Sequence, residues 1–190
     1  MKGTQYMSTR GFIAIEKANE PNSYTELLTH YDGYPDHMLT NIIALINRDG
    51  LDTVRDTLTA YTLWISINRE QPSIEGAEPD ENADYGTPEK NAWYAQNYGR
   101  MFTPGYGEHE EKYTDPRTIK IDDNPLDTEL FSDTLYNEFG YIIHNDGTVD
   151  TYANDFPKGW KKIGTTTPSK HKDTDLEKLA EMIMNNIIPD

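Results

Sequence analysis

The residues in this chain that are best suited to chemistry form one short cluster: His30, Asp32, Asp36 and His37. Imidazole and carboxylate groups gathered within eight residues can together hold a divalent cation. Tyr34 stands among them, and Arg10, further upstream, could pair with a phosphate group. This pattern gives one hypothesis for function: a metal-assisted hydrolase or a small nucleotide-binding protein.

The same cluster also has a purely structural interpretation. Its spacing matches no established metal-binding motif, and His30 shares a strand face with Asp32 only if the strand continues that far. In this interpretation Asp32 accepts hydrogen bonds from turn amides and Tyr34 packs into the core. The sequence leaves both alternatives open.

Two acidic stretches further along carry weaker signals. Residues 80–86 resemble the start of a calcium loop, but loop positions 6 and 12, which require Gly and Glu, are Tyr85 and Asn91. Residues 108–111 surround His109 with carboxylates, and a general acid–base role there would need a pocket. Both stretches are typical of solvated acidic loops.

Known catalytic signatures are absent from the rest of the sequence. The chain has no G-x-x-x-x-G-K-[ST], G-x-G-x-x-G or G-x-S-x-G motif. It has no cysteine, which excludes disulfides, thiolate catalysis and cysteine-ligated metals. We expect no cofactor, and the sequence is more typical of a binding protein than of an enzyme.

Strands and helices with clear patterns surround the cluster. Residues 11–16 and 24–31 predict a β-hairpin, because β-branched and aromatic side chains recur along both. Residues 35–49 carry a wide apolar helix face that ends at Gly50. A second helix is then expected, with its apolar stripe at Leu51, Val54, Leu58, Tyr61 and Ile65.

The rest of the chain also carries patterns typical of strands and of a helix. Residues 138–144 and 148–153 predict a hairpin with an Asp-Gly turn, and Thr174 can cap a last helix. Residues 117–121 predict a short strand.

The expected class is α+β, an antiparallel sheet with helices packed on one face and long acidic loops. We expect a single domain, residues 1–190, with residues 70–133 as an acidic loop-rich insertion.

Charge is distributed very unevenly along the chain. The formal net charge is -16, from 33 acidic and 17 basic side chains. Residues 70–155 hold 20 acidic and 5 basic side chains, whereas residues 1–69 hold 8 and 6. The stretch from 158 to 172 is basic, with five lysines and no acid. Such an acidic surface repels nucleic acid and anionic membranes and attracts basic protein surfaces.

Two segments resemble a family of small phage and plasmid proteins of no established activity. The first contains Ser8-Thr9-Arg10-Gly11-Phe12-Ile13-Ala14 and then His30-Tyr31-Asp32-Gly33-Tyr34, and the second spans residues 138–152. The family opens with a Thr-Arg-Ser-x-Ile-Ala-like strand and continues to a His-Trp-Asp-Gly-Tyr element, and here Gly11-Phe12 departs from its usual small polar pair. The resemblance implies an origin in a mobile genetic element and implies no reaction.

Two hypotheses follow for the function. In the first, the chain is an anti-defence protein of the anti-CRISPR or anti-restriction type, which mimics DNA and occupies the basic nucleic-acid-binding surface of a host nuclease. Its expected partner-facing residues are Glu75, Glu78, Asp80, Glu81, Asp84, Glu108, Glu110, Glu111, Asp122 and Asp123. In the second, a small-molecule site is formed by Arg10, His30, Asp32, Tyr34 and His37.

The expected location is the cytoplasm of the host cell. No apolar run approaches the roughly 20 residues of a membrane span. The first residues also lack the apolar core of a signal peptide. A soluble protein without direct nucleic-acid or membrane contact is therefore predicted, and its oligomeric state is left open.

Overall fold

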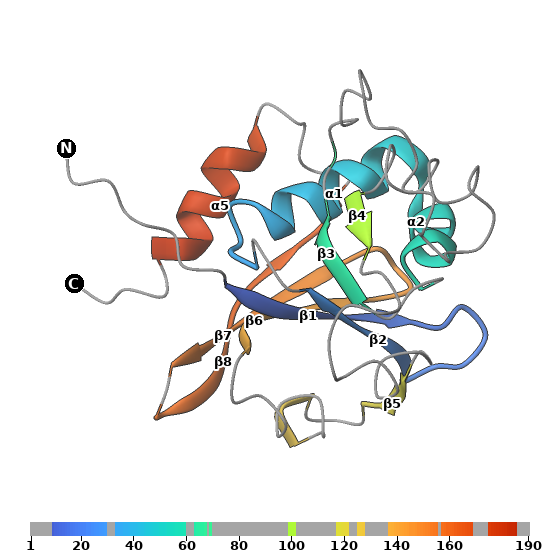
Figure 1. The fold of residues 1–190 in the computed structure, drawn as a ribbon, viewed down its shortest axis with the longest axis horizontal. Helices are drawn as coiled ribbons and strands as arrows, with labels where there is room; N and C mark the ends of the chain where they lie inside the picture. Colours follow the sequence, from blue (N-terminus) through green and yellow to red (C-terminus); the bar gives the residue numbers. More distant parts are fainter. Residues whose placement is uncertain are drawn as a thin grey trace, which may run out of the picture.

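One mixed β-sheet with helices on one side organises the molecule in the computed structural model (Figure 1). The structure describes residues 9–29, 33–59, 63–67, 69, 99–101, 117–121, 125–127, 137–155, 157–168 and 175–185. The strands are β1 (Arg10–Glu16), β2 (Ser23–Thr29), β3 (Leu63–Ile67), β4 (Gly99–Met101), β5 (Arg117–Lys120), β6 (Asn137–Ile143), β7 (Val149–Asp155) and β8 (Gly159–Thr166). The helices are α1 (Met38–Asp49), α2 (Leu51–Leu58) and α5 (Leu176–Asn185), with a short 3-10 helix, η2 (Pro125–Asp127).

The α+β class predicted from the sequence is confirmed, and the sheet is mixed rather than wholly antiparallel. Within the described residues, its strand order is β4-β3-β2-β1-β6-β7-β8, and β5 pairs with β2. β1 pairs in parallel with β6, and β2 in parallel with β3. Parallel pairing at the centre suits β1, whose side chains are buried on both faces and read as one continuous apolar run.

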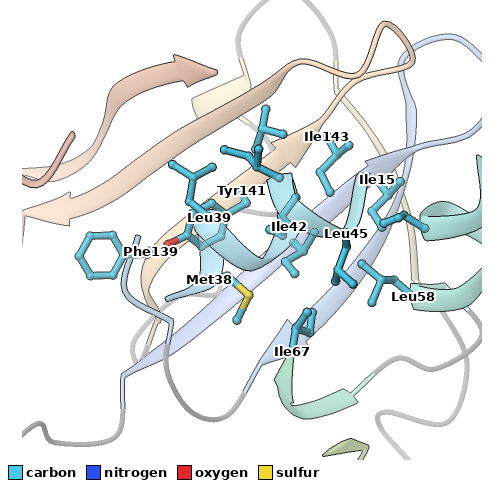
Figure 2. Close-up of a cluster of buried hydrophobic side chains, with 14 of the residues drawn as sticks. Ile15, Met38, Leu39, Ile42, Leu45, Leu58, Ile67, Phe139, Tyr141 and Ile143 are labelled. Atoms are coloured by element: carbon cyan, nitrogen blue, oxygen red, sulfur yellow. The ribbon is translucent and has the colours of Figure 1, made fainter. Parts of the chain in front are cut away.

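The helices cover one face of this sheet and complete the main core. α1 lies over the central strands, and its apolar side chains point down onto β1 and β6 (Figure 2). Ile42 and Leu45 of α1 are completely buried there, together with Ile15 and Tyr141 of the strands. Side chains recurring every three or four residues explain this packing, because they form one stripe of the helix.

A smaller core occupies the opposite face of the same strands. Phe12 and Ala14 of β1 point there, because side chains alternate along a strand. Phe12 packs edge-on against Trp160 of β8, with ring centroids 5.5 Å apart. β5 also contributes to this cluster, through Ile119. The sheet is therefore buried on both sides at its centre.

The predicted second helix is correct only as far as Leu58. α2 ends at Leu58, and Ile65, which was expected on its stripe, lies in β3, whereas Tyr61 lies outside the described residues. Trp64 decides this boundary: its side chain is fully buried and its indole N–H donates to the carbonyl oxygen of Leu58 at 3.2 Å. Tertiary burial of one large aromatic side chain outweighs the weak local helix propensity.

β8 is a strand that the sequence pattern did not predict. Residues 158–172 stood out in the sequence only as a basic stretch, and within it Gly159–Thr166 pairs antiparallel with β7. Lysine on an outer strand is common because it discourages pairing with other chains. The predicted cap of the last helix, Thr174, lies outside the described residues.

Within the described part of the chain, two threonine hydroxyls on the helix-covered face have no hydrogen-bond partner. Thr151 of β7 and Thr166 of β8 are buried, and both hydroxyls lack a partner. Burying an unsatisfied hydroxyl costs stability. We therefore expect Thr151→Val to raise the free energy of unfolding by about 1 kcal/mol in urea titrations.

A matched control for this prediction is Thr29→Val in β2. Thr29 is also buried, but its hydroxyl donates to the carbonyl oxygen of Gly11 at 3.1 Å. Its removal should lower stability by about 1 kcal/mol. Equal losses in both variants would contradict this interpretation of Thr151.

Candidate functional site

The structure places part of the predicted small-molecule cluster in structural roles. Tyr34 packs against Phe139 of β6, with ring centroids 5.3 Å apart, on the edge of the main core. His37 immediately precedes α1, and its Nε2 donates to the carbonyl oxygen of Ile67 at 3.1 Å. Arg10 is exposed at the start of β1. His30 and Asp32 lie outside the described residues.

Gly33, which directly precedes Tyr34, is fixed by close backbone packing. The Gly33 N–H donates to the carbonyl oxygen of Thr9 at 2.9 Å, and its carbonyl accepts from the Tyr141 hydroxyl at 2.7 Å. A Cβ at position 33 would approach the Thr9 carbonyl oxygen to 2.9 Å. Burial raises the pKa of Tyr141 well above its ordinary value, and Asp36 adds to this. The described part of the element therefore locks the chain against β1 and β6.

The ten acidic residues predicted to face a partner lie in other parts of the chain. All ten lie outside the described residues: Glu75, Glu78, Asp80, Glu81, Asp84, Glu108, Glu110, Glu111, Asp122 and Asp123. Ile121, the described residue directly before Asp122, donates its N–H to the carbonyl oxygen of Asn22 at 3.0 Å. Asp122 and Asp123 follow Ile121 directly in the chain.

A chain of polar contacts that the sequence analysis missed crosses the second face of the sheet. Tyr24 of β2 bonds through its hydroxyl to Nδ1 of His144, at 3.1 Å. Nε2 of the same ring lies 3.2 Å from Oδ2 of Asp150 on β7. The neutral tautomer with hydrogen on Nε2 satisfies both contacts, because it donates to the carboxylate and accepts from the phenol.

Asp150 is the centre of this chain of contacts. Its Oδ1 accepts from the Thr165 hydroxyl at 2.6 Å and from Lys162 Nζ at 2.7 Å, both on β8. The residue is buried, whereas the Lys162 side chain is 45% exposed. Three side chains, one directly after β6 and two from β8, therefore hold one carboxylate.

Burial, hydrogen bonds and charges in this cluster shift the pKa values of three residues. Burial by itself would raise the pKa of Asp150, but hydrogen bonds from His144, Lys162 and Thr165 outweigh it and hold the pKa at about 2. Burial, followed by the nearby carboxylate of Glu16, raises the pKa of Tyr24 to about 12. Burial and Asp150 likewise raise the pKa of Tyr152 to about 12.

The order Tyr–His–Asp resembles a proton relay, but its geometry favours a structural role. Both ring nitrogens of His144 are occupied, and the carboxylate of Asp150 is shared among three partners. Tyr24, which would have to contact a substrate, is only 3% exposed and has a pKa far above neutrality. A general acid–base group needs access to its substrate and a pKa near the working pH.

A second network holds the loops at the same end of the sheet. The buried Arg55 of α2 donates to the carbonyl oxygen of Glu16 at 2.9 Å, to Asp52 at 2.6 Å and to the side chain of Asn145 at 2.8 Å. The Glu16 carboxylate accepts the Asn145 N–H at 2.7 Å. The β1–β2 and β6–β7 connections are thereby tied to α2.

This end of the sheet presents an acidic outer surface. Four carboxylates are exposed on the β1–β2 connection, α2 and the β6–β7 turn: Glu20, Asp52, Asp56 and Asp146. The chain also leaves β5 here, because Ile121 is bonded to Asn22 of the β1–β2 connection. Figure 1 shows β5, α2 and the β1–β2 connection at the same end of the molecule.

Metal binding and membrane insertion have no feature to support them in the described residues. Among these residues, no three or more His, Asp or Glu side chains gather as metal ligands would. None of the helices within the described ranges combines the length and apolar character needed to cross a bilayer.

No protein-family model, curated protein or solved structure matches the chain.

Proposed function

We propose that this chain is an acidic interaction protein of a phage or another mobile element. It occupies the basic nucleic-acid-binding surface of a host defence nuclease, in the cytoplasm of the host cell. The observation that carries the proposal is the segregation of charge. Residues 70–133 hold 16 acidic and 5 basic side chains, a net charge of -11, whereas the other 126 residues hold 17 and 12, a net charge of -5.

Several described cations of the scaffold already have carboxylate partners nearby. Lys17 lies 3.8 Å from Glu20, and Arg55 lies 2.6 Å from Asp52. In the basic stretch that begins at residue 158, two lysines pair with β7: Lys158 with Asp155 at 3.0 Å and Lys162 with Asp150 at 2.7 Å. These pairs support a partner protein as the source of countercharge for residues 70–133.

The position of Ile121, which is bonded to Asn22 of the β1–β2 connection, supports the same proposal. The chain leaves β5 at the end of the sheet where Glu20, Asp52, Asp56 and Asp146 are exposed. Asp122 and Asp123 follow Ile121 directly in the sequence. Carboxylates spread over such a surface can replace nucleic-acid phosphates in a Lys- and Arg-lined groove and release the same counterions.

The proposal is tested by a pull-down from host lysate with the full chain as bait. Salt at about 500 mM reduces the Debye length to a few ångströms, whereas about 50 mM leaves surface charges interacting. We expect a basic nucleic-acid-binding protein to be retained at low salt and released at high salt, and identified by mass spectrometry. Retention of only acidic or neutral proteins, equal at both salt concentrations, would overturn the proposal.

A further inference from the structure

Two Asp-Gly pairs, Asp49–Gly50 and Asp146–Gly147, lie within the described residues and share one spontaneous reaction. The backbone nitrogen of the glycine can attack Cγ of the aspartate, because glycine has no side chain to shield that nitrogen. The new C–N bond closes a succinimide ring, and one carboxyl oxygen leaves as water with the amide hydrogen and the acid proton. Water then reopens the ring mainly to isoaspartate, in which the main chain runs through the side-chain carbon. The reaction needs no cofactor or oxidant, so its rate depends on how the fold holds the two groups.

In the β6–β7 turn, the attacking nitrogen is already committed to a hydrogen bond. Asp146 is exposed in this turn, and Gly147 follows it with a φ of 84°, in the region that favours glycine. The Gly147 N–H donates to the carbonyl oxygen of His144 at 2.9 Å. This bond must break before the nitrogen can give up its hydrogen, so the turn itself slows the reaction.

Thr148 holds the other reacting group, the Asp146 carboxylate, through two hydrogen bonds. Oδ1 accepts from the Thr148 backbone N–H at 2.9 Å and from the Thr148 hydroxyl at 2.6 Å. These bonds, the one from the hydroxyl most of all, hold the pKa of Asp146 below its ordinary value. Ring closure needs a carboxyl group that is free to turn toward Gly147 and is protonated, so that an oxygen can leave as water. Both bonds from Thr148 oppose these requirements.

The pair at the end of α1 has the same chemistry but a different partner. The Gly50 N–H donates to the carbonyl oxygen of Ile46 at 2.9 Å. Both oxygens of the Asp49 carboxylate accept from Arg48, Oδ1 from Nε at 2.8 Å and Oδ2 from Nη2 at 2.6 Å. A cationic partner on both oxygens restrains a carboxylate more strongly than a neutral partner on one, so we expect Asp146 to react before Asp49.

We propose that Asp146–Gly147 is a latent site of isoaspartate formation and that Thr148 sets the rate of this modification. The inference does not rest on the proposed function. Isoaspartate retains a carboxylate, so modification leaves the net charge unchanged. It adds one carbon to the main chain of a turn that the His144 N–H closes by donating to the Thr148 carbonyl oxygen at 2.9 Å. Because turn length sets the register of a hairpin, the modified turn no longer fits this pairing.

The test follows isoaspartate formation in the folded protein, incubated at neutral pH in heavy-oxygen water. Reopening of the succinimide inserts one heavy oxygen, which mass spectrometry of peptides assigns to one Asp-Gly pair. Thr148→Val removes the hydroxyl and keeps the backbone N–H, so Asp146 should isomerise about fivefold faster than in wild type, the effect of one hydrogen bond. Thr148→Ser, which retains the hydroxyl, should match wild type.

Arg48→Gln is the matched control, because it removes the charged partner of Asp49 and leaves Thr148 in place. It should accelerate isomerisation at Asp49 by about fivefold or more and leave Asp146 at the wild-type rate. In Thr148→Val the reverse is expected, with the Asp49 rate unchanged. Acceleration at both pairs in Thr148→Val would indicate general unfolding and contradict local control, and an unchanged Asp146 rate in that variant would overturn the inference.

A comparison that needs no variant keeps the test decisive if Thr148→Val does not fold. Wild type unfolded in concentrated urea has lost the bonds that restrain both pairs. Asp146 should therefore isomerise at least about tenfold faster in the unfolded protein than in the folded protein. Equal Asp146 rates in the two states would also overturn the inference.

Discussion

Gly140→Ala is expected to lower the free energy of unfolding by about 3 kcal/mol, at the upper end of what overpacking a core costs. A Cβ at position 140 would overlap the ring of Phe12, lying 2.8 Å from Cε2 and closer still to Cζ and Cε1. The ring has no room to withdraw, because Phe12 is completely buried and Trp160 packs edge-on against it. Urea unfolding with an unchanged m-value measures this loss.

Gly164→Ala in β8 is the matched control. There the nearest atom to an added Cβ is Cγ1 of the Ile183 side chain, at 3.3 Å, a much looser contact, so we expect a loss below about 1 kcal/mol. Trimming the obstacle should also restore stability: Phe12→Leu in the Gly140→Ala background should recover part of the loss. Equal unfolding midpoints for the two alanine variants would show that the Phe12 contact is not the cause.

Asp150→Asn is expected to lower the free energy of unfolding at pH 7 by about 2 kcal/mol. Burial opposes the charge of Asp150, but bonds from His144, Lys162 and Thr165 outweigh it and lower its pKa from 3.8 to about 2. A difference of this size corresponds to roughly 2 kcal/mol of stability. The variant retains the shape of the side chain and loses the carboxylate that its three partners share.

The pH dependence of this effect has a definite sign. The folded-state pKa lies below the unfolded value, so the carboxylate contributes its full stability above about pH 4 and loses it as the pH falls toward about 2. Wild type should therefore be more stable than Asp150→Asn at pH 7 and nearly equal to it near pH 2. Asp155→Asn, at the exposed pair with Lys158, should change stability by less than about 0.5 kcal/mol at any pH. A gap between wild type and Asp150→Asn that is the same at pH 7 and pH 2 would contradict the assigned contacts.

The parts of the fold that the sequence predicted are those with strong local patterns. The β1–β2 hairpin, α1 and the β6–β7 hairpin follow from side-chain periodicity and from turn residues such as Gly50 and Gly147, whose φ angles are positive. β3 and β8 were missed because tertiary contacts decide them: the burial of Trp64 in one and pairing with β7 in the other. The parallel pairing of β1 with β6 joins segments more than 120 residues apart, which no local pattern records.

In the candidate site, too, local sequence patterns and tertiary contacts gave different results. The recognisable His–Tyr–Asp–Gly–Tyr element suggested chemistry, but Gly33 and Tyr34 serve packing and His37 holds the end of β3. The contacts among Tyr24, His144 and Asp150 join residues that are 120 and 6 positions apart. The available sequence signal for these contacts was polar residues on both sides of the Asp-Gly turn, His144 before it and Asp150 and Tyr152 after it. Such positions indicate one face of a hairpin rather than a particular network of contacts.

The most direct test of the acidic-surface proposal compares two charge reversals of equal size. In one variant Glu78, Asp80, Glu81 and Asp84 become lysine, and in the other the exposed scaffold acids Glu138, Asp155, Asp175 and Glu181 become lysine. The affinity for the basic protein retained in the pull-down is measured against salt concentration for both variants and for wild type. We predict that the first variant loses at least tenfold in affinity and flattens the salt dependence, whereas the second stays within about threefold of wild type. Equal losses in both variants would reduce the effect to net charge, and salt-insensitive binding by wild type would contradict the proposal outright.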